Sequence, residues 1–127
     1  MQGGKEMFKI DGDKIKLTRG DRCEFDFEDD YGYIFQKGDQ IKFNVYEEDG
    51  LENPPVLSKI FEVTEETPIV TISLTSQETK FGPMKSEEIT YWYEIEKIGD
   101  ETPLGYDENG PKELILYPEG ADANAKS

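Results

Sequence analysis

Side chains that could carry out nucleophilic or acid–base chemistry are scarce in this sequence. It contains no histidine and one cysteine, Cys23. Histidine is the commonest general base and metal ligand, and Ser–His and Cys–His nucleophile pairs depend on it. A single cysteine permits neither an internal disulfide nor a cysteine-based zinc site. Because Cys23 alternates with Phe25 and Phe27, we expect a buried and inert thiol.

Carboxylates, by contrast, are plentiful. The chain carries 29 Asp and Glu against 14 Lys and Arg, which gives a net charge of −15. Two acidic clusters could hold calcium through their oxygens; they comprise Asp26, Glu28, Asp29 and Asp30, and then Glu47, Glu48 and Asp49. Neither cluster has the spacing of a calcium-binding loop. We therefore interpret both as solvated acidic faces and predict no cofactor and no metal site, with calcium as the alternative.

Pairs of carboxylates are also the machinery of glycoside hydrolysis. With 29 acidic residues in 127, some pairs fall at suitable separations by accident, and no other polar constellation accompanies them. The sequence therefore predicts no catalytic residue and no enzymatic activity.

The most informative aromatic residues are Tyr91, Trp92, Tyr93 and Tyr106. In a strand, alternation places Trp92 on the face opposite to the two flanking tyrosines. One face should belong to the core, and the other could be a platform for a sugar or a protein partner. These four residues are therefore the candidate contact surface, unless the C-terminal segment covers the Trp92 side.

The tripeptide Arg19-Gly20-Asp21 matches the integrin-binding motif. It also belongs to a series in which Gly-Asp stands two residues before an apolar residue, at 12–13, 20–21 and 38–39. Glycine supplies positive φ and aspartate caps turns. We interpret the tripeptide as a turn that leads into a strand.

Charge narrows the range of partners. Nucleic acids and anionic membranes bind basic surfaces, so this acidic chain is expected to bind neither. Residues 1–24 carry six basic and five acidic groups, residues 25–66 three and twelve, and residues 67–127 five and twelve. The near-neutral first segment is therefore an expected contact region. The sequence also lacks an apolar run of signal-peptide length, which predicts synthesis in the cytoplasm without Sec export.

Residue choice favours strands over helices. The three alanines all fall in the last seven residues, whereas Val, Ile, Thr and aromatic residues are frequent throughout. Alternating apolar residues and turn signals predict strands at 5–10, 14–18, 23–27, 40–46, 57–63, 69–74, 89–98, 104–106 and 113–117. Residues 75–80 could form one helical turn capped by Ser76, and residues 99–103 a turn.

These elements predict an all-β fold, a two-sheet antiparallel β-sandwich of about eight short strands. A small β-barrel is the alternative architecture. The length suits a single domain over residues 1–118, followed by a flexible acidic and polar tail at 119–127.

Three stretches, at 37–46, 89–95 and 104–120, together resemble small β-sandwich proteins encoded among tail genes of phages and prophages of Gram-positive gut bacteria. The layout is also similar to the N-terminal domain of phage baseplate upper proteins. In that family a β-sandwich anchors the protein to the baseplate, and a helical stalk carries receptor-binding parts. This sequence has no heptad segment, so the resemblance implies a free-standing structural subunit or accessory protein, with no catalytic residue.

The sequence as a whole predicts a non-enzymatic structural or assembly protein of a phage tail or baseplate, located in the virion. Its expected partners are other protein subunits, including further copies of itself. A carbohydrate-binding module that uses exposed aromatics on a saccharide is the alternative. An immunoglobulin-like secreted domain is disfavoured because a signal peptide and a disulfide are both missing.

Overall fold

The computed structural model describes residues 8–11, 14–29, 32–47, 54–99, 102–104 and 112–118. Within these segments the chain forms nine strands and no helix, so none of them contains a helix able to cross a bilayer. The strands are β1 (Phe8–Asp11), β2 (Lys14–Thr18), β3 (Cys23–Glu28), β4 (Gln40–Tyr46), β5 (Leu57–Glu62), β6 (Ile69–Leu74), β7 (Ile89–Lys97), β8 (Thr102–Leu104) and β9 (Lys112–Tyr117).

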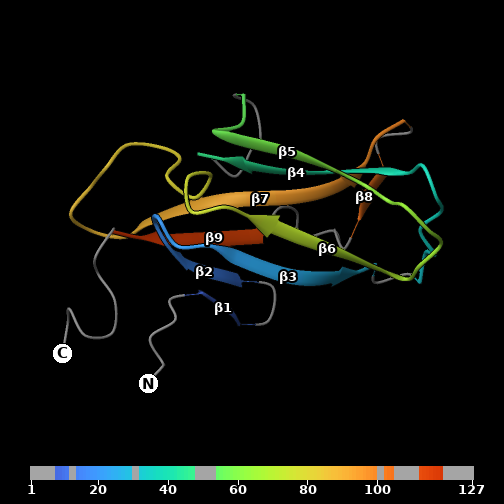
Figure 1. The fold of residues 1–127 in the computed structure, drawn as a ribbon. Helices are drawn as coiled ribbons and strands as arrows, with labels where there is room; N and C mark the ends of the chain where they lie inside the picture. The colour runs from blue at the N-terminus through green and yellow to red at the C-terminus, as the bar shows by residue number, and fades with distance from the viewer. Residues whose placement is uncertain are drawn as a thin grey trace, which may run out of the picture.

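Two sheets form two layers (Figure 1). The larger sheet has the order β1-β2-β9-β7-β4-β5, with β8 paired to the end of β7, and the smaller sheet consists of β3 and β6. The all-β sandwich expected from the sequence is confirmed. In the described part of the chain the large sheet ends in β1 and β5 and does not close into a barrel.

One pair of neighbouring strands departs from the antiparallel arrangement. Strand β9 inserts between β2 and β7, and it runs parallel to β2 with Ile15 opposite Leu114. Parallel neighbours need a long connection rather than a hairpin. Here 93 residues separate the end of β2 from the start of β9, so local turn signals could not reveal the pairing.

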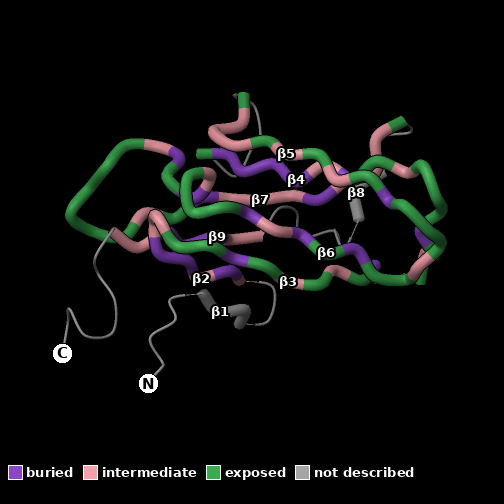
Figure 2. Tube along the Cα trace, in the orientation of Figure 1, coloured by how far each residue is buried: buried purple, intermediate pink, exposed green. Residues whose placement is uncertain are grey.

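The core lies between the two sheets, and alternation along each strand supplies it. Burial therefore changes from residue to residue along β5 and β6 in Figure 2, whereas β4 and β9 each contain a run of buried residues. The expected inward residues of β4 and β6 are all buried: Ile41, Phe43, Val45, Val70, Ile72 and Leu74. Phe25 and Phe27 of β3 pack against this core from the small sheet.

The two sheets are joined by a bent two-stranded ribbon. In the large sheet Gln40 pairs with Glu62, and the same register continues five residues further to the bridge between Phe35 and Thr67. Beyond the bridge, both segments of the ribbon pass to the other layer, where β3 pairs with β6 (Figure 1, right). As a result, β5 and β6 follow one another along a single outer edge of the sandwich.

Two local predictions need correction. Residues 76–79 form a turn in which Thr79 N donates to Thr75 O at 3.1 Å. The cap is Thr75, whose hydroxyl accepts from Glu78 N at 3.1 Å, and not Ser76. Residues 102 and 103 belong to β8, because they pair with β7, although a turn was expected there. Other predictions, including the tail at 119–127, fall outside the described residues.

Candidate functional site

The four aromatic candidates do not share one surface. Tyr91 is only 1% exposed, and Tyr93 packs against the core from the same face of β7. Trp92 lies on the opposite face and is half-buried, as the alternation predicts. Tyr106 lies outside the described residues. On the outward face of β7, Trp92 is therefore the candidate available to a ligand.

A polar and aromatic group surrounds Trp92 on the face of the large sheet that points away from the core. Tyr46 stands opposite Trp92 across the β4–β7 pair. Asn44 Nδ2 donates to the Tyr46 hydroxyl at 3.1 Å, and that hydroxyl donates to Glu94 Oε2 at 3.3 Å. We name Asn44, Tyr46, Trp92 and Glu94 the outer-face cluster.

The outer-face cluster is largely shielded from solvent, although it lies on an outward face. Asn44 and Tyr46 are both buried, and the carbonyl oxygen of the Asn44 amide has no hydrogen-bond partner among the described residues. Desolvation, with a smaller contribution from Glu96, raises the pKa of Glu94 above its ordinary value. Asn44, Tyr46 and Glu94 were not among the site residues predicted from the sequence. Their position on the outward side of two strands was visible, but the pairing of those strands was not.

The Arg19-Gly20-Asp21 tripeptide is part of the packing. Arg19 Nη1 donates to the main-chain oxygens of Phe81 and Gly82 at 2.8 and 3.1 Å. Gly20 N donates to the Thr79 hydroxyl at 2.9 Å, and Gly20 has a φ of 92°. The turn predicted from the sequence is confirmed, and its arginine holds the 79–82 loop in place.

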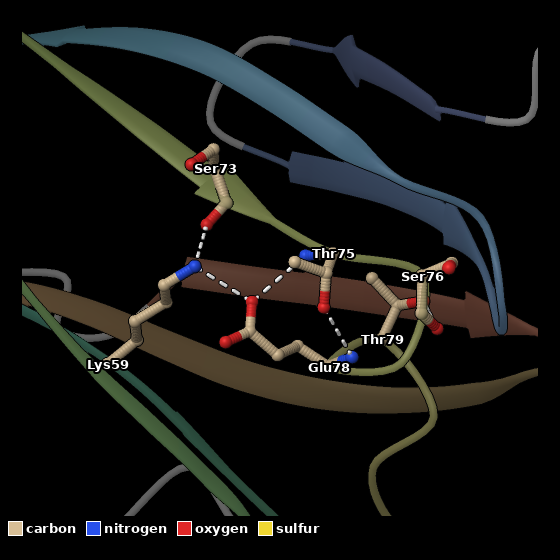
Figure 3. Close-up of polar contacts among 6 residues, drawn as sticks. All are labelled: Lys59, Ser73, Thr75, Ser76, Glu78 and Thr79. Atoms are coloured by element: carbon tan, nitrogen blue, oxygen red, sulfur yellow. Dashed lines mark hydrogen bonds and ion pairs between the residues drawn. The ribbon is translucent and has the colours of Figure 1, made fainter.

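The two sheets are connected by a polar clamp between β5 and the loop after β6 (Figure 3). Lys59 Nζ donates to Ser73 O and to Glu78 Oε1, both at 2.8 Å. Glu78 Oε1 also accepts from Thr75 N at 2.9 Å. The hydrogen bond from Lys59 is the leading reason that the pKa of Glu78 lies below its ordinary value.

A groove lies along the outer edge where β5 and β6 approach the bend of the ribbon. It is lined by residues 60–65, 67 and 69–71 and has a volume of about 510 Å³. Ile60 and Ile69 at its margin are 52% and 41% exposed. We name this feature the edge groove. No sequence signal located it, because it arises from the bend that brings the two strands together.

The acidic clusters serve local structure where the structure describes them. Asp29 Oδ2 accepts from Tyr33 N at 3.1 Å, and Asp26 Oδ1 accepts from the Thr71 hydroxyl at 2.9 Å. Among the described residues, no group of three or more His, Cys, Asp or Glu could hold a metal ion. Burial raises the pKa of the Cys23 thiol to about 11.

Comparison with known proteins gave no match. No family model matches the chain, and no curated protein or solved structure matches it.

Proposed function

We propose that this chain is a non-enzymatic structural or assembly protein that acts by protein–protein contact, as a component of a phage or prophage tail or baseplate. The observation that carries the proposal is the edge of the large sheet at β5, beside which no further strand lies among the described residues, with the edge groove next to it. Edge strands present main-chain donors and acceptors to a neighbouring chain. The strand pattern that resembles tail-associated β-sandwich proteins supports the setting in a phage particle.

The location can be tested with particles. Tail-bearing particles from the strain that encodes the chain are purified on a density gradient and analysed by quantitative mass spectrometry. We expect the chain at a fixed ratio to the tail proteins across the gradient fractions. A host cytoplasmic protein of similar size and charge serves as the control. A chain that stays in the soluble fraction with that control contradicts the proposal.

A carbohydrate-binding module is the second candidate, and the outer-face cluster favours it. An indole, an amide, a phenol and a carboxylate on one face are the groups that sugars contact through stacking and hydrogen bonds. On a glycan array, this candidate predicts a reproducible saccharide that Trp92→Ala loses and Ile60→Ala retains. Our first proposal predicts no saccharide hit for the unaltered chain.

A further inference from the structure

Of the strand edges that the structure describes along the edge groove, β6 is capped near both of its ends, at Ile69 and Ser73, whereas β5 is open. Lys59 Nζ donates a hydrogen bond to the main-chain carbonyl of Ser73, which points to the side of β6 that faces away from β3 (Figure 3). The Thr67 hydroxyl accepts from Ile69 N and donates to Ile69 O, both at 3.1 Å. These contacts use the main-chain groups of Ile69 and the carbonyl of Ser73, which are among the positions at which a further strand would pair with β6.

Strand β5 presents a different edge. Hydrogen-bonded partners alternate along an antiparallel pair. Val63 N donates to Asp39 O, and Val56 N donates to Val45 O. These bonds show that the main-chain N–H and C=O groups of the odd-numbered residues of β4 point toward β5. The main-chain groups of Ser58, Ile60 and Glu62 therefore point to the open side of the sheet.

The two halves of β5 differ in how well they are protected against pairing with a strand of another chain. Pro54 and Pro55 precede the strand, and Lys59 in its first half points inward to the clamp with Glu78. Proline and inward-pointing charges are devices that block edge-to-edge pairing. The second half, from Ile60 to Glu62, has neither device and carries a half-exposed isoleucine.

Charge defines the chemistry of the occupant. The described residues that line the edge groove include Glu62 and Glu65 and no basic residue, and the chain has a net charge of −15. A second copy of the chain would bring further negative charge to this edge. A cationic segment would pair with it favourably and would be steered toward it.

We propose that the edge groove binds an extended, cationic segment of a partner protein, which adds to the large sheet as a strand beside β5. This inference rests on the proposed function, since it names the partner chemistry at the open edge. In such a strand, a β-branched apolar residue would pair beside Ile60, and a Lys or Arg two residues away would pair beside Glu62. Main-chain bonds supply affinity, and these two side chains supply selectivity.

Peptide titration of the full, ¹⁵N-labelled chain tests the inference. The probe is a nine-residue peptide with blocked termini. Every second residue is Thr, and the residues between them are alternately Lys and Ile. We expect it to shift the amide signals of Ile60 and Glu62 and to slow their hydrogen exchange. Two control peptides, one with Glu in place of Lys and one N-methylated at alternate amides, should bind at least about tenfold more weakly.

Matched variants locate the site. Ile60→Lys places a guarding charge on the edge and should lower peptide affinity at least about tenfold. Ile34→Lys makes the same change at another exposed isoleucine, outside the groove lining, and should leave the affinity unchanged. Glu62→Gln should weaken binding and reduce its dependence on salt.

Several results would overturn the inference. They are the absence of amide shifts at β5, equal binding of the N-methylated peptide, an equal effect of both lysine variants, or self-association through β5 without peptide. If the chain co-purifies with tail particles but does not bind the peptide, the inference about the edge groove fails and the proposed function stands. If the chain binds the peptide but is absent from particles, the proposed function fails and binding at the edge groove stands.

Discussion

Lys59 of β5 donates a 2.8 Å hydrogen bond to the main-chain carbonyl of Ser73 in β6, so a side chain of one sheet caps a main-chain group at the edge of the other. The same ammonium group contacts Glu78, and Glu78 in turn holds the turn that follows β6 through Thr75. Lys59 thus links three features: the edge of β6, the turn at 75–79 and the large sheet, to which β5 belongs. Its contribution to stability can be measured.

Lys59→Met should lower the free energy of unfolding by about 1–2 kcal/mol, because a carbonyl and a carboxylate lose a charged partner at a site that is still partly exposed. Denaturant unfolding followed by circular dichroism measures the change. Lys37→Met, at an exposed lysine, is the control and should change stability by less than about 0.5 kcal/mol. Equal effects of the two variants would show that the clamp adds nothing.

The same pair gives a pH dependence. The pKa of Glu78 is lowered in the folded state, first by its hydrogen bond from Lys59. The resulting stabilisation is present above the ordinary glutamate pKa and is lost as pH falls below it through the lowered value. The difference in stability between the unaltered chain and Lys59→Met should therefore shrink at acidic pH. A difference that stays constant down to pH 3 would contradict this origin.

Glu94 should behave in the opposite way. Desolvation raises its pKa in the folded state, so its ionisation opposes folding at pH values above that raised pKa, and the penalty declines as pH falls toward the ordinary glutamate pKa. Glu94→Gln keeps an acceptor for the Tyr46 hydroxyl and removes the charge. We expect a gain of about 0.5 kcal/mol or less in unfolding free energy at pH 7, because the group is only partly buried and solvent screens it, and this gain should disappear near pH 4. Glu87→Gln, at an exposed glutamate, should show no such gain.

Gly82 allows the Tyr91 hydroxyl to lie against the main chain. A Cβ at Gly82 would overlap that hydroxyl, and the glycine has a φ of 73°. Gly82→Ala should cost about 3 kcal/mol or more. Gly38→Ala has a comparable positive φ with open space around it, and it should cost about 1–2 kcal/mol. Similar losses for both variants would exclude the overlap as the cause.

Tyr91→Phe tests the same contact from the other side. Within the part of the chain that the structure describes, the buried Tyr91 hydroxyl has no hydrogen-bond partner, and an unsatisfied buried hydroxyl is destabilising. The phenylalanine should therefore raise the unfolding free energy by about 1 kcal/mol and partly rescue Gly82→Ala in the double variant. Strict additivity of the two changes would contradict the proposed contact.

Cys23 should react slowly in the folded protein. Burial raises its pKa to about 11, and at pH 8 this leaves about a thousandth of the thiol ionised. Labelling with a thiol reagent should be limited by unfolding and should accelerate through the denaturant transition. The unfolded chain is the reference for full reactivity. Native-state labelling at the unfolded rate would show that Cys23 is accessible.

Alternation in the sequence already determined much of the fold. The spacing of Ile41, Phe43 and Val45 assigns both the strand and its inward face, because successive side chains of a strand point to opposite sides. The same reasoning separates Trp92 from Tyr91 and Tyr93. The Gly-Asp pair at 20–21 likewise marks its turn, because glycine relieves the strain of positive φ.

Only the tertiary structure decided which strands are neighbours. Tyr46 meets Glu94 and Trp92 across 48 and 46 positions of sequence, and β9 lies beside β2 although 93 residues separate them. Periodicity records the faces of one strand, but pairing depends on long-range packing that has no local spacing. The edge groove follows from the bend that brings residues 60–65 and 69–71 together, and so it existed nowhere in the pattern of the sequence.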